Sequence, residues 1–419
     1  MKIVFYIHKR QKLNSQTILT TPVPGTQSAL VWVADGLAKL GCEVIVLNNS
    51  KTGGFSGVQY INVASENDAI EKARGMKGID FLVACSGTGS LLTEHDYPDV
   101  RFKVYWMQNP QIGQVHFTAM NKGQIDKIVC VSEFHQDLYM RYRQYKDITF
   151  VHNGVKVDFF PDELLHLPKK NRIIFAGSIC KQKGVHHLLR VMPLVRTVYP
   201  DVRLAIAGSY SLYYDNYDSG AFGIAERDYE EQYLRPYLYN DKAKVRAYIE
   251  LLGALPIGKL ASELAQSLLC VVNPNWTGSL ETCCNVALEA QAAGIPVVGV
   301  NRGALPEVIL DGVTGVIVKQ RSDRALADAI VGLLQDEETR LRLGRNGRER
   351  ILREFTYDLL VRKWLSLFKA MLDGKPIQKK RVFQERGNLM RNLTLTGLRT
   401  LGLAEPAARV RRRLKAVLK

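Results

Sequence analysis

The sequence has no hydrophobic run close to the roughly 18 residues that a membrane-spanning helix needs. Its start also lacks the pattern of a secretory signal. Residues 1–7 form a short apolar run, and His8, Lys9 and Arg10 follow it. This pattern predicts a first β-strand rather than a signal peptide, and we expect the chain to be cytoplasmic.

The cysteines are few, and their spacing indicates no disulfide framework. The seven cysteines (42, 85, 130, 180, 270, 283 and 284) are odd in number, and none are spaced C-x-x-C. Several lie in apolar, strand-like runs, which favours buried thiols in a reducing compartment. The neighbouring Cys283 and Cys284 have no histidine or third cysteine close by in the sequence. The sequence therefore predicts no metal site.

Acidic residues are almost missing from the C-terminal tail. Residues 375–419 hold 13 of the 57 Lys and Arg residues but only Glu385 and Glu405 as acids, so most of the net charge of +16 lies there. A helix beginning at Pro406 would surround an apolar face with basic side chains, which suits an anionic membrane surface. A solvated tail without structure is the equally weighted alternative.

The rest of the composition is that of an ordinary globular protein, with 46% hydrophobic and 23% charged residues. A length of 419 residues exceeds what one core normally serves, so two domains are expected. Short β-branched runs alternate with helical stretches, which predicts parallel sheets covered by helices.

The expected strands form two series. The first contains 3–7, 44–47, 81–84, 104–107 and 128–131, and the second 173–176, 204–207, 269–272, 297–300 and 316–318. A helix opening at Gly25 and ending at Gly41 separates the first two strands. Three further helices are expected at 323–334, 337–355 and 357–372. The expected domains are 1–165, 166–355 with a tyrosine-rich insertion at 209–248, a helical segment at 356–374, for which the resemblance given below implies a return to the first domain, and the tail at 375–419.

Residues 281–296 carry the strongest chemical signal. Glu281 precedes a predicted helix, Glu289 lies on it, and Gly294 and Pro296 end it. Unpaired backbone amides at a helix start favour a negatively charged group such as a diphosphate. Glu281 would then meet hexose hydroxyls, and Glu289 would accept hydrogen bonds from a ribose. The alternative without a binding role is an amphipathic helix with two solvated glutamates.

Other motifs occur around this segment in a fixed order. They are Pro24-Gly25-Thr26-Gln27, His152-Asn153-Gly154-Val155, Ala176-Gly177-Ser178 with Lys183-Gly184, Pro306-Glu307-Val308, and Asp311-Gly312-Val313-Thr314-Gly315. Together with residues 281–298 they resemble the family-4 glycosyltransferases up to about residue 370. The resemblance implies an α/β GT-B fold: two facing Rossmann-like domains, a C-terminal helix returning to the first domain, and here a basic tail.

The resemblance also implies a function. It indicates a retaining glycosyltransferase that moves a hexose from a UDP- or GDP-sugar to a glycan or lipid-linked glycan, in bacterial cell-surface polysaccharide synthesis. The nucleotide sugar would be a co-substrate, and neither a cofactor nor a metal is expected. Peripheral contact with the inner face of the plasma membrane would suit a lipid-linked acceptor.

Site residues follow from the matched motifs. Glu281 and Lys183 are the catalytic candidates, without a protein nucleophile, because the leaving phosphate would take the acceptor's proton. The expected donor-binding residues are Gly25, Gly177, Ser178, Lys183, Cys283, Cys284, Asn285 and Glu289. The expected acceptor-binding residues are Gln108, Asn109 and Glu133, which follow predicted strands.

Three positions depart from the family pattern. Ser178 stands where an arginine normally grips the diphosphate, so Lys183 keeps half of that clamp, and Lys181 or Arg302 could compensate. Gln108 lies where many members present a histidine, and Cys284 replaces a glycine.

Alternative functions from other classes stay open. The pI near 9.4 allows a nucleic-acid-binding protein, although the charge is confined to the tail and no binding module appears. Ser178 and Gln108 allow a non-catalytic nucleotide-sugar-binding subunit of the same fold. A glycan phosphorylase or a nucleotide-sugar epimerase of similar two-domain build is a further alternative, and the missing lysine motif of a pyridoxal site disfavours the former.

Overall fold

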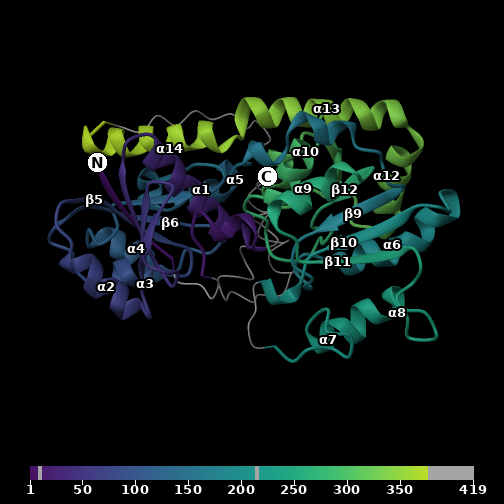
Figure 1. The fold of residues 1–419 in the computed structure, drawn as a ribbon, viewed down its shortest axis with the longest axis horizontal. Coiled ribbons are helices and arrows are strands. Elements are labelled where there is room, and N and C mark those ends of the chain that lie inside the picture. Colours follow the sequence, from purple (N-terminus) through teal and green to yellow (C-terminus); the bar gives the residue numbers. More distant parts are fainter. Residues whose placement is uncertain (8–11, 213–216, 376–419) are drawn as a thin grey trace, which may run out of the picture. The chain divides into compact units, whose positions relative to one another are not determined.

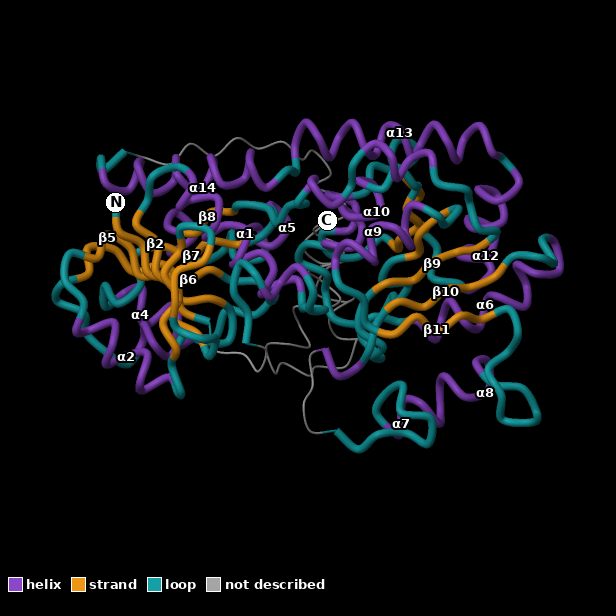
Figure 2. Tube along the Cα trace, viewed as in Figure 1, coloured by secondary structure: helices purple, strands orange, loops and turns teal. Residues whose placement is uncertain are grey.

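The computed structural model describes residues 1–7, 12–212 and 217–375, and all of them belong to one compact unit. The predicted tail helix from Pro406 lies outside the described residues. Two sheets, each covered by helices, make up this unit (Figures 1 and 2).

The first sheet has eight strands in the order β3-β4-β2-β1-β5-β6-β7-β8, and only the edge pair β3 and β4 is antiparallel. The strands are β1 (Lys2–Tyr6), β2 (Glu43–Asn48), β3 (Gly53–Phe55), β4 (Val58–Asn62), β5 (Ile79–Cys85), β6 (Val100–Trp106), β7 (Lys127–Cys130) and β8 (Ile148–Phe150). Its central strands are buried on both faces, as the β-branched runs predict.

Helices in this half connect the parallel strands. They are α1 (Gly25–Lys39), α2 (Glu66–Gly75), α3 (Ser90–Thr93), α4 (Gln114–Asn121) and α5 (Glu133–Asp137). Short 3-10 helices occur at Thr17–Leu19, Arg143–Asp147, Val157–Phe159 and Asp162–His166. Pro24 stands before the first turn of α1, and Gly41 follows its end in a left-handed conformation (φ +85°), as predicted.

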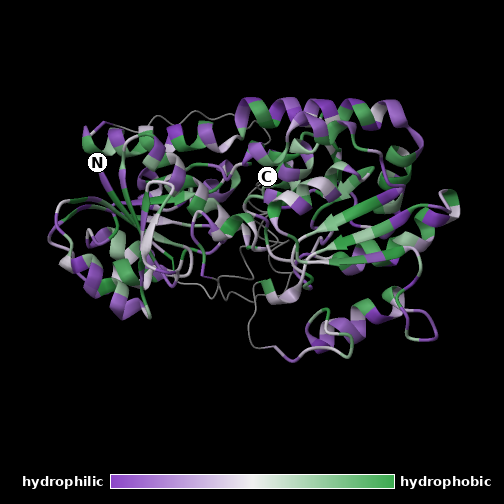
Figure 3. Ribbon diagram, viewed as in Figure 1, coloured by the Kyte–Doolittle hydropathy of each residue, from purple (hydrophilic) through white to green (hydrophobic). Residues whose placement is uncertain are grey.

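The second sheet has six parallel strands in the order β11-β10-β9-β12-β13-β14. They are β9 (Arg172–Ala176), β10 (Arg203–Ala207), β11 (Ile249–Gly253), β12 (Leu269–Val271), β13 (Val297–Val300) and β14 (Gly315–Val318). Figure 3 shows β9 and β10 as largely hydrophobic strands, and the residues of the central pair β9 and β12 are all buried.

The helices of this half are α6 (Val185–Val198), α9 (Ile257–Ala265), α10 (Asn285–Ala292), α11 (Leu305–Val308), α12 (Asp323–Gln335) and α13 (Glu337–Glu354). Side-chain oxygens cap the starts of α12 and α13, where Ser322 accepts from Ala325 N and Asp336 from Thr339 N. Both helices begin at the residue that the sequence pattern predicts.

The tyrosine-rich insertion is partly helical. It contains a 3-10 helix (Tyr210–Leu212), α7 (Arg227–Tyr229), a π-helical turn (Glu230–Leu234) and α8 (Arg235–Leu238). Glu230 is fully buried, and its carboxylate accepts hydrogen bonds from the backbone of Phe222, Ile224 and Ala225. The buried charge thus organises the loop that precedes the helices.

The last described helix, α14 (Tyr357–Leu372), returns to the first sheet. It packs against α1, and the indole of Trp364 meets Trp106 at 4.8 Å between ring centroids. Phe368 lies 4.3 Å from the ring of Phe81. These buried aromatic contacts hold the C-terminal helix on the first domain, which confirms the crossing predicted for 356–374.

The sequence analysis did not predict four of the strands: β3, β4, β8 and β11. Two of them have only three residues, and β8, β3 and β11 lie at sheet edges. Edge strands bury one side less completely, so their hydrophobic pattern is weak. In β11 only Ile249 is buried, and the strand follows directly on the predicted insertion.

Candidate functional site

A cavity opens where the strand ends of the second domain meet the first helix of the first domain. Ligands of open α/β sheets bind at the carboxyl ends of the strands, and β9 and β10 end here. The lining comes from both domains and includes Gly25, Ser28, Trp32, Val155, Lys156, Gly177, Ser178, Gly208, Leu255, Asn285, Val286 and Glu289. Five of the predicted donor-binding residues therefore meet around one space.

The start of α10 borders this cavity, where Asn285 and Val286 belong to the lining. Cys284 is the N-cap residue and provides no side-chain cap, so the first amides of the helix keep their hydrogen-bonding capacity. Asn285 follows, and its Oδ1 is buried without a partner among the described residues. A Cβ on Gly25 would lie 2.4 Å from Asn285 Nδ2, so α1 approaches α10 this closely only with glycine at position 25.

Glu289 lies in the second turn of α10 and faces the cavity. No group in the described part of the chain forms a hydrogen bond or ion pair with its carboxylate. Burial raises the pKa of Glu289 to about 7. A half-buried, unpaired carboxylate in a cavity is a candidate for contact with a ligand.

Glu281 and Lys183 lie outside the cavity lining and pair with each other. Lys183 Nζ donates to Glu281 Oε2 at 2.8 Å, and Asn273 Nδ2 donates to the same oxygen. Asn273 adopts a left-handed backbone conformation (φ +41°), which is uncommon for a residue other than glycine. The two predicted catalytic residues are thus brought together, and Asn273 is a third member that the sequence analysis missed.

Ser178, the residue in place of the family arginine, is 2% exposed, and its Oγ has no partner among the described residues. The candidates for compensation are engaged elsewhere. Lys181 Nζ bonds Tyr233 OH at 3.0 Å, and Arg302 donates to the carbonyls of Trp276 and Gly278. Neither supplies the missing guanidinium in this structure.

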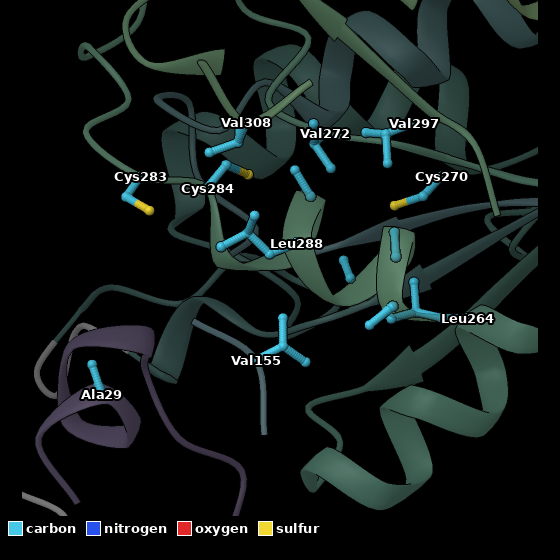
Figure 4. Packing of buried hydrophobic residues seen from close by; sticks show 14 of the residues in the cluster. Ala29, Val155, Leu264, Cys270, Val272, Cys283, Cys284, Leu288, Val297 and Val308 are labelled. Atoms are coloured by element: carbon cyan, nitrogen blue, oxygen red, sulfur yellow. The ribbon is translucent and has the colours of Figure 1, made fainter. Parts of the chain in front are cut away.

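Cys283 and Cys284 are buried before α10, and Figure 4 shows both among buried hydrophobic side chains that include Leu288 and Val308. Burial raises the pKa of Cys284 to about 12 and that of Cys283 well above its usual value. Their thiols are therefore neutral, and only the local backbone can contribute to anion binding. The described residues contain no cluster of three or more metal-ligating side chains.

The predicted acceptor-binding residues lie away from this cavity. The side-chain amide of Gln108 pairs with Asn153, accepting from Nδ2 at 2.8 Å and donating to Oδ1 at 3.3 Å. Asn109 is exposed, and Glu133 is 8% exposed at the start of α5. The structure does not bring these three into one site with Glu289.

Two motifs that the sequence analysis quoted without a role meet each other. His152 Nε2 lies 2.5 Å from Glu307 Oε1, although 155 residues separate them. The loop at Ile18–Val23 also lines the cavity, and the sequence analysis missed it. Its polar and apolar residues follow no periodicity, so only its place before Gly25 could have indicated it.

Among the described residues, no helix is long and apolar enough to cross a bilayer.

Comparison with known proteins agrees with this geometry. Residues 157–350 match the family model "Glycosyl transferases group 1". A putative glycosyltransferase of Bacillus subtilis, YtcC, is 26% identical over 268 residues, covering 60% of this chain and 62% of that protein. For the next two curated relatives the chain spans 50% and 49% of their length.

Solved structures share the fold at low identity. Sucrose-phosphate synthase from Thermosynechococcus elongatus has a TM-score of 0.70 and 18% identity, covering 89% of this chain and 100% of that one. Anabaena HepE, solved with UDP-glucose, has a TM-score of 0.65 and 15% identity over 88% of this chain and 100% of that one. Residues 157–350 are therefore similar to the group 1 glycosyl transferases, and the chain has the GT-B fold.

Proposed function

We propose that this chain transfers a hexose from a nucleotide-diphosphate sugar to a glycan or lipid-linked glycan, with retention at the anomeric carbon. The observation that carries this proposal is the unpaired carboxylate of Glu289 beside the uncapped start of α10. One helix thus offers an acceptor for ribose hydroxyls and backbone donors for a diphosphate.

UDP-sugars are the favoured donor class. The similar Anabaena protein was solved with UDP-glucose, and the B. subtilis relative is named as a putative glycosyltransferase. GDP-sugars remain the second donor class to test. Cell-surface polysaccharide synthesis is the cellular role that we propose, because its acceptors are glycans of the required kind.

The chemistry rests on stabilising the departing diphosphate. Lys183 is held 2.8 Å from Glu281 and lies in the loop between β9 and α6. When a diphosphate enters, its negative charge competes with Glu281 for this ammonium, and Glu281 becomes free to accept hydrogen bonds from the hexose. In same-face attack the leaving phosphate removes the acceptor's proton, so no protein nucleophile takes part.

The experiment measures nucleotide release by the purified full chain from UDP-, GDP- and ADP-sugars without acceptor, beside Glu289→Ala. Slow hydrolysis of one donor, lost in the variant, is the expected result. If no donor is turned over and none raises the unfolding temperature, the proposal is wrong.

A second candidate function is a non-catalytic, nucleotide-sugar-binding subunit. Ser178 favours it, because the ammonium of Lys181 bonds Tyr233, the guanidinium of Arg302 bonds backbone carbonyls, and Ser178 Oγ has no partner among the described residues. This candidate predicts that a donor raises the unfolding temperature and is not hydrolysed, even when candidate glycan acceptors are added.

We also propose that the tail binds an anionic membrane surface. Its 13 basic and two acidic residues support this, and such binding would bring the enzyme to a lipid-linked acceptor.

A further inference from the structure

Glu307 belongs to the second domain, and within the described residues its carboxylate forms hydrogen bonds with three groups of the first domain. Its Oε1 accepts from Glu133 N at 2.9 Å, and its Oε2 accepts from Phe134 N at 3.0 Å. His152 Nε2 is the third partner, at 2.5 Å. The residue is 8% exposed, so these contacts are shielded from water and strengthened by the low local dielectric.

The first-domain partners follow consecutive parallel strands. Glu133 and Phe134 follow β7, and His152 follows β8. A parallel contact follows β6, where the carbonyl of Gln108 accepts from Thr282 Oγ1 at 2.6 Å. Three neighbouring strand ends of the first sheet are thus tied to two short segments of the second domain.

Those two segments are also tied to each other at Glu281. Ala304 N donates to the carbonyl of Glu281 at 2.8 Å. A Cβ on Gly303 would lie 2.3 Å from that same carbonyl oxygen. The backbones at Gly303 and Glu281 are therefore too close for a side chain at position 303. Three residues after Ala304, on α11, stands Glu307.

Hydrogen bonds from α13 fix the backbone of α11. Arg350 on α13 donates to the carbonyls of Glu307 at 2.8 Å and Val308 at 2.9 Å. Arg350 thus ties the backbone of α11 to α13, while Ala304 N ties the residue just before α11 to the carbonyl of Glu281.

We propose that Glu307 is a positioning residue that couples the contact between the two domains to the placement of Glu281. Its side chain contacts the segments that follow β7 and β8, and its backbone lies three residues from the hydrogen bond between Ala304 and Glu281. Displacement of those segments would therefore shift Glu281 and its pair with Lys183. This inference deepens the proposed function and rests on it, because Glu281 is taken as the donor-sugar contact.

The test compares Glu307→Gln with Glu230→Gln. The glutamine at 307 keeps the shape but places an amide against one of the three donors. Glu230 is the matched control, since it is also buried and accepts three backbone N–H groups within the insertion. With the donor identified, kcat of Glu307→Gln should fall on the order of tenfold to a hundredfold. The dissociation constant for the free nucleotide should change by no more than about threefold, since Glu289 and Asn285 are untouched.

Hydrogen–deuterium exchange gives a readout independent of turnover. In Glu307→Gln, exchange should rise both at 132–138 and at 280–285, and in Glu230→Gln at neither. Unchanged exchange at 280–285 in Glu307→Gln overturns the coupling, and so do equal losses of kcat in both variants. A wild-type protein without any turnover contradicts the proposed function, while the exchange data still decide the coupling.

If Glu307→Gln does not fold, His152→Phe replaces it. The phenyl ring keeps the edge contacts with Phe150 and Phe355 and removes only the bond to Glu307. The same rise in exchange at 280–285 is expected, and its absence overturns the proposal.

Discussion

Lys183 Nζ lies 2.8 Å from Glu281 Oε2, so the cation and the carboxylate expected to handle the donor neutralise each other in this structure. Glu281 is the less exposed partner, with 12% of its side chain accessible against 33% for Lys183. The ammonium can therefore turn toward an incoming diphosphate while Asn273 continues to hold the carboxylate.

The first prediction concerns this pair. Lys183→Met and Glu281→Gln should each lower kcat/KM on the order of a hundredfold, and the double variant should lose much less than the product of the two. Steady-state kinetics of the four proteins measures the coupling. Lys181→Met is the control, since its ammonium bonds Tyr233, and a loss equal to that of Lys183→Met would contradict the assignment.

The second prediction uses the carboxyl of Glu289, whose pKa burial raises to about 7. An unfolded glutamate titrates near 4.3, so between these values the folded state binds more protons and stability falls as pH rises. Glu289→Gln should therefore raise the unfolding temperature by about 2 °C at pH 8 and change it little at pH 4.5. Calorimetry at both pH values tests this, and an equal shift at both contradicts it.

The same variant should also change nucleotide binding. The ionised carboxylate is the stronger hydrogen-bond acceptor, so wild-type affinity for the nucleotide should rise between pH 6 and pH 8. Glu289→Gln should bind weakly and lose this pH dependence. Titration calorimetry at several pH values measures both effects.

The third prediction concerns the floor of the cavity. A Cβ on Gly208 would lie 1.8 Å from the carbonyl oxygen of Gly177, a contact that only backbone movement can relieve. Gly208→Ala should destabilise the fold by about 1–3 kcal/mol and abolish nucleotide binding. Gly332→Ala is the control, because no atom lies within 4 Å of the added Cβ and the residue is helical. Chemical unfolding and nucleotide titration of both variants decide the matter.

The fourth prediction concerns the thiols. All seven cysteines are buried and outside disulfide bonds, and burial raises the pKa of Cys270, Cys283 and Cys284. The native protein should react with almost no dithionitrobenzoate within minutes, and all seven thiols should react in denaturant. Rapid labelling of Cys284 in the native state, read by mass spectrometry, would show that the loop before α10 opens.

The fifth prediction concerns residues 376–419. The full chain should sediment with vesicles that contain anionic phosphatidylglycerol, and added salt should release it. Sedimentation with neutral phosphatidylcholine vesicles should be negligible. Binding that persists when all 13 Lys and Arg residues of the tail are changed to glutamine would assign the membrane contact to another surface.

The sequence pattern predicted the core strands and the long helices because hydrophobic periodicity is a local signal. Runs such as Ile173–Ala176 are buried on both faces, and α14 repeats its apolar residues at helical spacing. Edge strands such as β11 bury fewer residues and were missed. In the site, Asn285 and Glu289 were found because one helix fixes their spacing.

Gln108 and Glu133 show the limit of such reasoning. Their place after predicted strands suggested contact with an acceptor, and the structure shows Gln108 paired with Asn153 and the backbone N–H of Glu133 bonded to Glu307. Nothing within the first domain's sequence could show that the second domain reaches these strand ends.

The sequence by itself determined two α/β halves, the helix that starts at Asn285 and the chemical types of the residues around it. The tertiary structure alone decided which side chains meet: Lys183 with Glu281 across 98 residues, and His152 with Glu307 across 155. The reason is that periodicity and capping act within a few turns, whereas these pairs depend on how whole sheets and helices pack.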